Sequence, residues 1–297
     1  MMIDRLLLGD YAFDGVDRYS EEKPKDYVIP LGVETISNVI KVALKSGAQG
    51  LSFSVSPNMY NVLRHLKLEE YDREFGLYPI LPDAASTLRL EFENGILGMM
   101  TNLFGKMSIG TKAKSLVQGG AAALEMDPIK MMKTYLEGEI SIFMRAVPKG
   151  AKLKAVFLHQ MVSDLMLSFQ MKDLFSEYVG FVSDSFEVMP GFVTKNFARF
   201  ADFVIDAGYS SKDLVIMTPF NKAGFEMIPS KESCEEALSK IPKAQVIAMH
   251  MLALGYRKLD EATEYINSLP RKVSCVVGVS KESYAEKTFS YLHSRLA

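Results

Sequence analysis

The sequence lacks several features that would point to a particular class of protein. It contains no tryptophan and only two cysteines, which form no C-x-x-C pair, and this favours a reduced, cytoplasmic setting. Its charges are balanced, with 34 basic against 36 acidic residues and no long run of one sign. Nucleic acid is therefore not expected as a partner.

Long hydrophobic runs are also missing. No run of about eighteen apolar residues occurs, so no membrane-spanning helix is expected. Near the N-terminus, Leu6, Leu7 and Leu8 form a short apolar run without the pattern of a cleavable signal. We therefore expect a cytoplasmic protein, neither secreted nor membrane-bound, with a small molecule as its partner.

The C-terminal part of the chain has the clearest pattern. It reads VIAMHMLALGY, DEATEYINSL, KVSCVVGVS and SKESYAEKTFSYL, over residues 246–292. Apolar runs that alternate with amphipathic segments in this way are typical of consecutive strand and helix units. This segment therefore predicts the last two units of an α/β fold.

Six further strands are expected upstream, and helices lie between most of them. One strand is expected between residues 179 and 194, either as GFVSDSF or as PGFVT, and a helix is expected over 162–178. The other five are expected at residues 5–9, 50–54, 77–81, 153–159 and 213–219, and the strand of the seventh unit spans 244–250. Eight units favour a closed (β/α)8 TIM barrel formed as a single domain by residues 1–297. The absence of G-x-G-x-x-G after the first strand argues against a Rossmann domain.

About seventy residues separate the third and fourth strands, which is too long for a simple connection. We expect a helical insertion at about residues 84–150, with an amphipathic helix over Pro128–Met144. The insertion is rich in methionine, at Met99, Met100, Met107, Met126, Met131, Met132 and Met144. Methionine makes adaptable surfaces, so the insertion is either a lid or a homo-oligomer contact, with ordinary helical packing as the alternative.

In a TIM barrel the chemistry belongs at the C-terminal ends of the strands. Many polar residues follow the expected strands and form a ring at this mouth. They are Asp10, Tyr11, Ser52, Ser54, Ser56, Asp83, His159, Gln160, Thr194, Asn196, Thr218, Asn221, His250 and Ser280. Several of them also suit helix caps, Thr194 and Ser280 among them.

Four members of this ring are the candidate catalytic residues. His159 ends the strand AVFLH, where an imidazole serves as acid or base, and His250 holds the matching place in AMHML. Asp10 and Asp83 supply carboxylates beside them. The two pairs could bind a divalent metal, but no H-x-H or H-E-x-x-H spacing supports one, so no metal is predicted.

A second candidate site follows the last strand. The tetrapeptide SKES opens two expected helices, at Ser230 and at Ser280, and Ser283 with Glu286 has capping-box spacing. The second copy follows VVGV, at the end of the barrel where phosphate often binds to a glycine turn and a helix N-terminus. Gly278, Ser280 and Lys281 are therefore candidate ligands of a phosphate or another anion.

Parts of the sequence resemble a known family. Residues 246–292 are similar to the C-terminal portion of aldo-keto reductase-like barrels, and IKVALKSGAQGLSFS followed by Pro57 resembles their second unit. AVFLH resembles the fourth strand, so the resemblance implies a catalytic role for His159. The chain departs from the family at three places. The family has an aspartate after its second strand, where this chain has Ser54, and five residues later this chain has Met59, with Tyr60 beside it. The third strand ends in Ile80, Leu81 and Pro82, without the lysine that the family has there.

Three functions remain open at this stage, and the sequence identifies no cofactor. The first is an enzyme that acts on a small anionic or phosphorylated metabolite by acid/base chemistry, with His159 assisted by Asp10 or Asp83. The second is a nicotinamide-dependent reductase of aldo-keto reductase-like type, with Tyr60 or Tyr11 as proton donor. The third is a barrel without catalysis that serves binding or assembly through the methionine-rich insertion.

Overall fold

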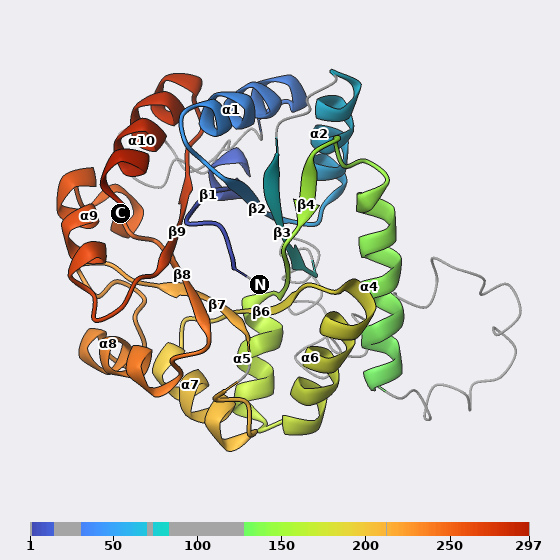
Figure 1. Cartoon of the computed structure of the whole chain (residues 1–297), viewed down its shortest axis with the longest axis vertical. Coiled ribbons are helices and arrows are strands. Elements are labelled where there is room, and N and C mark those ends of the chain that lie inside the picture. Colours follow the sequence, from blue (N-terminus) through green and yellow to red (C-terminus); the bar gives the residue numbers. More distant parts are fainter. Residues whose placement is uncertain (1, 15–30, 70–73, 83–127, 212, 297) are drawn as a thin grey trace, which may run out of the picture.

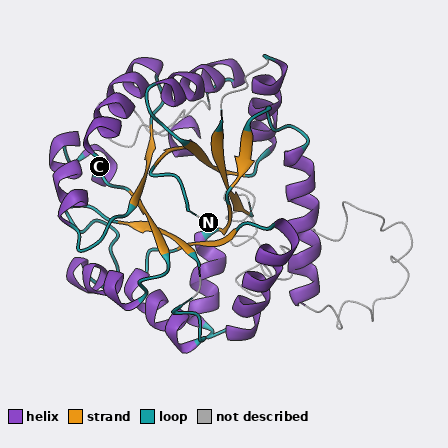
Figure 2. Cartoon of the chain, viewed as in Figure 1, coloured by secondary structure: helices purple, strands orange, loops and turns teal. Residues whose placement is uncertain are grey.

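The computed structural model describes residues 2–14, 31–69, 74–82, 128–211 and 213–296 of the chain. Its strands form a parallel barrel with helices on the outside (Figure 1). Figure 2 shows the same arrangement, with the strands enclosed by a ring of helices. The predicted (β/α)8 fold is therefore confirmed, whereas most of the predicted insertion, residues 83–127, lies outside the described residues.

The strands close into a ring of eight positions. They are β1 (Leu6–Gly9), β2 (Gly50–Ser54), β3 (Phe75–Leu81), β4 (Ala151–Leu153), β5 (Ala155–Leu158), β6 (Met189–Val193), β7 (Val215–Pro219), β8 (Gln245–Met249) and β9 (Ser274–Gly278). β4 and β5 both pair with β3 and share the fourth position. The order is β2-β1-β9-β8-β7-β6-β5-β3, and the pairing of β2 with β3 closes the ring.

The helices that the structure describes follow these strands along the chain. They are α1 (Val33–Lys45), α2 (Pro57–Leu68), α4 (Pro128–Met144), α5 (Gln160–Ser168), α6 (Lys172–Phe186), α7 (Phe197–Asp206), α8 (Lys231–Lys240), α9 (Leu259–Ser268) and α10 (Glu282–Arg295). Two 3-10 turns, η1 (Asp10–Asp14) and η3 (Ala253–Gly255), follow β1 and β8. Each strand therefore delivers its C-terminal end to one face of the barrel, as the predicted site requires.

Alternate strand residues divide between two apolar layers. One cluster fills the inside of the barrel and the other lies between the strands and the helices, as the two-residue period of a strand dictates. The inner cluster contains Leu7, Tyr78, Ala155, Phe157, Met189, Val193, Val215, Met217, Ile247 and Met249. The barrel is thus packed at its centre, and polar chemistry is confined to its ends.

The predicted helix over 162–178 is wrong, because two helices, α5 and α6, occupy this region. Gln170 takes a left-handed backbone with a φ of 52°, the N–H of Met171 donates to the carbonyl of Met166 at 2.9 Å, and the N–H of Gln170 donates to Leu167. These are the bonds of a Schellman C-cap, which usually has glycine at this position. Because Gln170 replaces the glycine, the sequence gives no helix-ending signal here.

The fifth strand position is taken by β6, which matches the PGFVT alternative. Within it, Gly191 faces the aromatic ring of Phe157 on β5, and a Cβ atom at Gly191 would lie only 2.6 to 2.8 Å from three ring atoms. Glycine is therefore required by close packing inside the barrel. Residues 180–186, the other alternative, belong to α6.

We expect Gly191→Ala to lower the free energy of unfolding by about 1–3 kcal/mol, because the ring of Phe157 must leave its position. Gly180→Ala in α6 is the matched control, since a Cβ there meets nothing within 4 Å. Alanine favours a helix, so the control should raise stability by about 0.5–1 kcal/mol. Urea denaturation measures both, and equal effects of the two substitutions would contradict the packing argument.

The two SKES segments differ in the structure. Ser230 caps α8, because its Oγ accepts a hydrogen bond from the N–H of Ser233 at 3.2 Å. The second copy has no such cap: α10 begins at Glu282, and the residue before it, Lys281, makes no side-chain cap hydrogen bond. The predicted capping by Ser280 is therefore wrong, because α10 begins two residues after Ser280 and Lys281 holds the cap position.

Candidate functional site

The predicted site residues within the described part of the chain lie at the C-terminal mouth of the barrel. Asp10, His159 and His250 come directly after β1, β5 and β8, and Ser280 and Lys281 follow β9. Asp83 lies outside the described residues, so its catalytic role stays a prediction.

His159 links the end of β5 to the start of α5. Its backbone N–H donates to the carbonyl of Leu81 at 2.7 Å, and its ring Nδ1 accepts from the N–H of Met161 at 3.3 Å. Because Nδ1 is an acceptor, the proton of the neutral ring lies on Nε2. His159 thus caps a helix with one ring nitrogen and presents an N–H donor with the other.

The protonation state of His159 follows from its burial. Desolvation lowers the pKa of His159 from its usual 6.5 to about 4. The ring is therefore neutral at pH 7 and stays neutral down to about pH 5, where an exposed histidine is charged. A neutral imidazole that donates from Nε2 polarises a carbonyl or holds a developing oxyanion, but it is not a base in that state.

Asp10 connects the exits of β1 and β2. Its Oδ2 accepts a hydrogen bond from the backbone N–H of Ser54 at 2.6 Å. This oxygen therefore holds the residue after β1 against the last residue of β2. This contact could not be predicted from sequence spacing, because it joins two loops 44 residues apart.

Several other members of the predicted polar ring are also engaged in local structure. Ser56 caps α2 by accepting from the N–H of Met59. The amide of Asn221 exchanges two hydrogen bonds with the backbone of Phe225, which closes the loop after β7. These residues shape the loops around the mouth.

His250 meets a charged pair from the two neighbouring strand exits. Its Nδ1 lies 2.8 Å from Oε2 of Glu226, and Oε1 of the same carboxylate is 2.5 Å from Nζ of Lys195. Lys195 follows β6, Glu226 lies in the loop after β7, and His250 follows β8. Three consecutive exits thus contribute one group of ionisable side chains, which we call the mouth triad: Lys195, Glu226 and His250.

Asp164 of α5 lies close enough to Lys195 to feel its charge. Its Oδ1 accepts from the hydroxyl of Thr194 at 2.6 Å, and the Thr194 Oγ1 accepts from the N–H of Asn196. Burial raises the pKa of Asp164, while hydrogen bonds to Thr194 and Gln160 and the charge of Lys195 oppose the rise. The predicted capping role of Thr194 is wrong, because Asn196 holds the cap position of α7 and Thr194 bonds the N–H of Asn196, before the helix begins.

The turn after β9 brings the predicted anion ligands in front of a helix. Gly278 ends β9, and Ser280 and Lys281 precede the fourteen-residue helix α10. The first backbone N–H groups of α10 receive no side-chain cap from Lys281, and a helix N-terminus carries partial positive charge. Glu282, in the first turn, opposes an anion at the same place.

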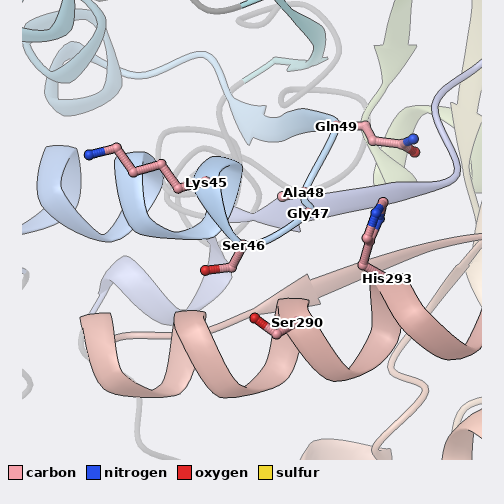
Figure 3. A pocket seen from close by; sticks show the side chains of 7 residues that line it. All are labelled: Lys45, Ser46, Gly47, Ala48, Gln49, Ser290 and His293. Carbon is pink, nitrogen blue, oxygen red and sulfur yellow. The ribbon is translucent and has the colours of Figure 1, made fainter.

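A pocket of about 430 Å³ lies at the other end of the barrel (Figure 3). Gly47, between α1 and β2, is one of its lining residues, and its φ of 116° and the close approach of His293 require glycine there. Gln49 accepts hydrogen bonds from the N–H groups of Arg5 and Leu6. The acidic and basic groups described above converge instead at the C-terminal mouth.

Sequence reasoning did not identify Asp164, Lys195 or Glu226. Lys195 stands two residues after a strand, so a search for charges after strands would have found it. Glu226 lies seven residues beyond β7 and Asp164 is within a helix, so no spacing rule indicates either residue.

Two features are absent from the described residues, a metal-binding cluster and a membrane-spanning helix. These residues contain no group of three or more histidine, cysteine, aspartate or glutamate side chains placed to hold a metal ion. Within the same residues, no helix has both the length and the apolar character needed to cross a membrane.

Comparison with solved structures finds aldo-keto reductase-like barrels. Two structures from Pseudomonas aeruginosa, described provisionally as aldo-keto reductases, match 99% and 100% of the chain and 92% of their own length, with TM-scores of 0.57 and 0.60. A glycerol dehydrogenase from Gluconobacter oxydans matches with a TM-score of 0.50, covering 97% of this chain and 86% of that one. Each is 11% identical in sequence, so the likeness concerns the fold. No family model and no curated protein matches the chain.

Proposed function

We propose that this protein is a barrel enzyme that acts on a small anionic or phosphorylated metabolite by acid/base chemistry at the C-terminal mouth. The observation that carries the proposal is the state of His159. A buried, neutral imidazole with its proton on Nε2 is a preorganised donor for a substrate oxygen. Such a donor is of use where negative charge develops on that oxygen during reaction.

His159 acts as the hydrogen-bonding acid in this proposal. Its low pKa makes the resting ring neutral, so the N–H polarises a carbonyl without first having to lose a proton. Asp10, at the exit of β1, assists from the same mouth with its carboxylate, which also accepts from the N–H of Ser54. Asp83 is the second candidate for this assisting role.

The anionic group of the metabolite binds at the turn after β9. Gly278 lets the backbone approach the ligand, Ser280 donates its hydroxyl, and Lys281 supplies a positive charge. The N-terminus of α10 adds backbone N–H groups, and this field outweighs the single charge of Glu282 when Lys281 is present.

Thermal unfolding with added ligand tests this proposal. A small phosphate ester at about a hundred times its Kd should stabilise the protein by about 2.7 kcal/mol, because it binds only the folded state. Lys281→Gln should remove most of this effect. Lys287→Gln, an exposed lysine farther along α10, is the matched control and should retain it. Equal responses of the two variants would contradict the anion site.

A nicotinamide-dependent reductase is the second candidate. It is favoured by the place of His159 after the fourth strand position of a barrel whose structural neighbours include a glycerol dehydrogenase. This candidate needs a tyrosine at the mouth to donate a proton to the substrate. Tyr60 packs against the apolar layer between strands and helices, whereas Tyr11 in η1 is 41% exposed and better placed to reach a ligand. Stabilisation by NADPH alone would favour this candidate.

The assembly function rests on the methionine-rich insertion. Of its methionine side chains, the structure describes those of Met132, which is buried in the core, and Met144, which is 39% exposed. A polar residue at Met132 would therefore destabilise the fold itself. Met144, with the exposed Ile142 beside it on α4, is the better position at which to test self-association.

A further inference from the structure

The segment before β1 lies at the N-terminal end of the barrel, opposite the mouth. In Figure 1 the N-terminal end of the chain lies inside the ring of strands. The hydrogen-bonded ladder of β1 reaches back to Arg5, whose carbonyl accepts from the N–H of Cys275 at 2.9 Å. Ile3 and Asp4 precede this ladder, and Ile3 packs against the inner apolar cluster. We call these two residues, Ile3 and Asp4, the strap.

Side chains of two strands hold the strap in place. The N–H of Ile3 donates to Oε1 of Gln245 on β8 at 2.9 Å, and the N–H of Asp4 donates to the hydroxyl of Tyr78 on β3 at 2.7 Å. The same hydroxyl donates to Oδ2 of Asp4 at 2.8 Å. One phenol thus binds both the backbone and the carboxyl group of Asp4, so closure of the strap depends on this pair.

The carboxyl group of Asp4 occupies a space that a glycine leaves open. Gly76 of β3 lies beside it, and a Cβ atom there would overlap Oδ2 of Asp4 and come within 2.7 Å of Cε2 of Tyr78. The backbone of Gly76 has no positive φ, so close packing requires glycine at this position. Tyr78 itself is fully buried. The barrel is therefore shaped to receive an acid at this end.

Few charges face this acid. Desolvation raises the pKa of Asp4 above its usual 3.8, while the hydrogen bond from Tyr78 and the charge of Lys154, between β4 and β5, oppose the rise. Burial also raises the pKa of Tyr78, which therefore stays a neutral donor. Gln245 of β8 adds an uncharged amide, and the guanidinium of Arg5 donates to a backbone carbonyl just before β9. The charged form of Asp4 is thus less stable in the closed strap than in water.

We infer that the strap is a pH-sensitive closure of the N-terminal end of the barrel, which tightens when Asp4 is protonated and loosens when Asp4 is charged. An open strap returns the carboxyl group to water, so the closed strap binds the proton more tightly than the open one. A fall in pH therefore favours closure, and a rise in pH favours opening. Opening removes Ile3 from the inner apolar cluster and exposes that cluster to water from this end. The inference does not depend on the proposed function, because it concerns the opposite end of the barrel.

Amide hydrogen exchange of the strap, followed by NMR between about pH 4 and about pH 7, tests the inference. The exchange rates of Ile3 and Asp4, divided into those of an unstructured peptide at the same pH, give their protection. We expect higher protection at the acidic end of this range. Global unfolding predicts the reverse, because the burial of His159 makes the folded state less stable as the pH falls. Protection that stays constant or decreases toward low pH would overturn the inference.

Two substitutions of acids identify the group that titrates. Asp4→Asn keeps an oxygen that accepts from Tyr78 but cannot lose a proton, so its protection should be the same at every pH. Asp213→Asn is the matched control, because Asp213 is exposed at the same end of the barrel, before β7. It should retain the native pH dependence. An unchanged pH dependence in Asp4→Asn, or its loss in Asp213→Asn, would contradict the role of Asp4.

A second pair of variants tests the hydrogen bonds. Tyr78→Phe should lower the protection of the Asp4 amide about tenfold at every pH, the effect of one hydrogen bond. Tyr178→Phe is the control, because its hydroxyl is also buried but binds the carbonyl of Val156, away from the strap. Equal loss of protection in both variants would show exchange by global unfolding and overturn the inference. Urea denaturation identifies any variant that does not fold, and Asp4→Asn still tests the strap if Tyr78→Phe fails.

Discussion

Replacing Phe175 with alanine should lower the free energy of unfolding by about 3–5 kcal/mol. The ring of Phe175, on α6, is fully buried between helices and barrel. It stacks on Phe192 with ring centroids 4.9 Å apart, and it meets Phe203 and Tyr209 edge-on at 5.3 and 5.2 Å. Removal leaves a cavity whose aromatic walls cannot collapse without breaking these contacts.

Phe169 is the matched control, because it lies just before the same helix but is 63% exposed. Phe169→Ala should change stability by less than about 0.5 kcal/mol. Urea denaturation followed by circular dichroism measures both variants. If Phe175→Ala changes the free energy of unfolding only slightly, and its dependence on urea concentration is unchanged, this aromatic cluster does not hold α6 on the barrel.

The stability of the protein should fall as the pH drops from 6.5 toward 4, partly because of His159. Its folded pKa of about 4 lies below the unfolded value of 6.5, so the unfolded chain binds the proton first. The loss of stability caused by His159 is absent above pH 6.5, grows between pH 6.5 and pH 4, and is complete below pH 4. It amounts to at most ~3 kcal/mol, since the ring is partly exposed.

His159→Gln removes this titration and keeps an oxygen that can accept from Met161. The variant should therefore lose less stability than the native protein between pH 7 and pH 4, by up to ~3 kcal/mol. Chemical denaturation at several pH values measures the difference. His293→Gln, at the end of α10, is the control and should follow the native curve. Parallel curves for native protein and His159→Gln would refute the buried, neutral state.

The elements of the fold could largely be predicted from local patterns. The strand Gly50–Ser54 and the helix Pro128–Met144 were predicted with the bounds that the structure shows, because turn residues or helical periodicity mark them. The division between α5 and α6 could not be predicted, since Gln170 ends the helix in place of a glycine. The choice between the two candidates for the fifth strand required Gly191, whose role depends on packing with Phe157.

The candidate site could be predicted in part. The rule that chemistry lies after barrel strands placed His159 and His250 at the mouth, but it gave no partner for either. Glu226 and Lys195 belong to the site because strands β6, β7 and β8 are neighbours and because the loop after β7 folds back on them. Such contacts depend on tertiary structure. The neutral state of His159 depends on its burial and on a hydrogen bond to Met161, which no sequence pattern records.

The most direct test of the account is the NMR signal of His159 at pH 7 during a titration with dihydroxyacetone phosphate. We expect a neutral ring with its proton on Nε2, no charging above about pH 5, and a saturable shift as ligand fills the mouth. The signals of His65 and His293, outside the mouth, should not move. A His159 that is charged near pH 6.5, or that ignores the ligand, would contradict the proposal of an active site at this end of the barrel.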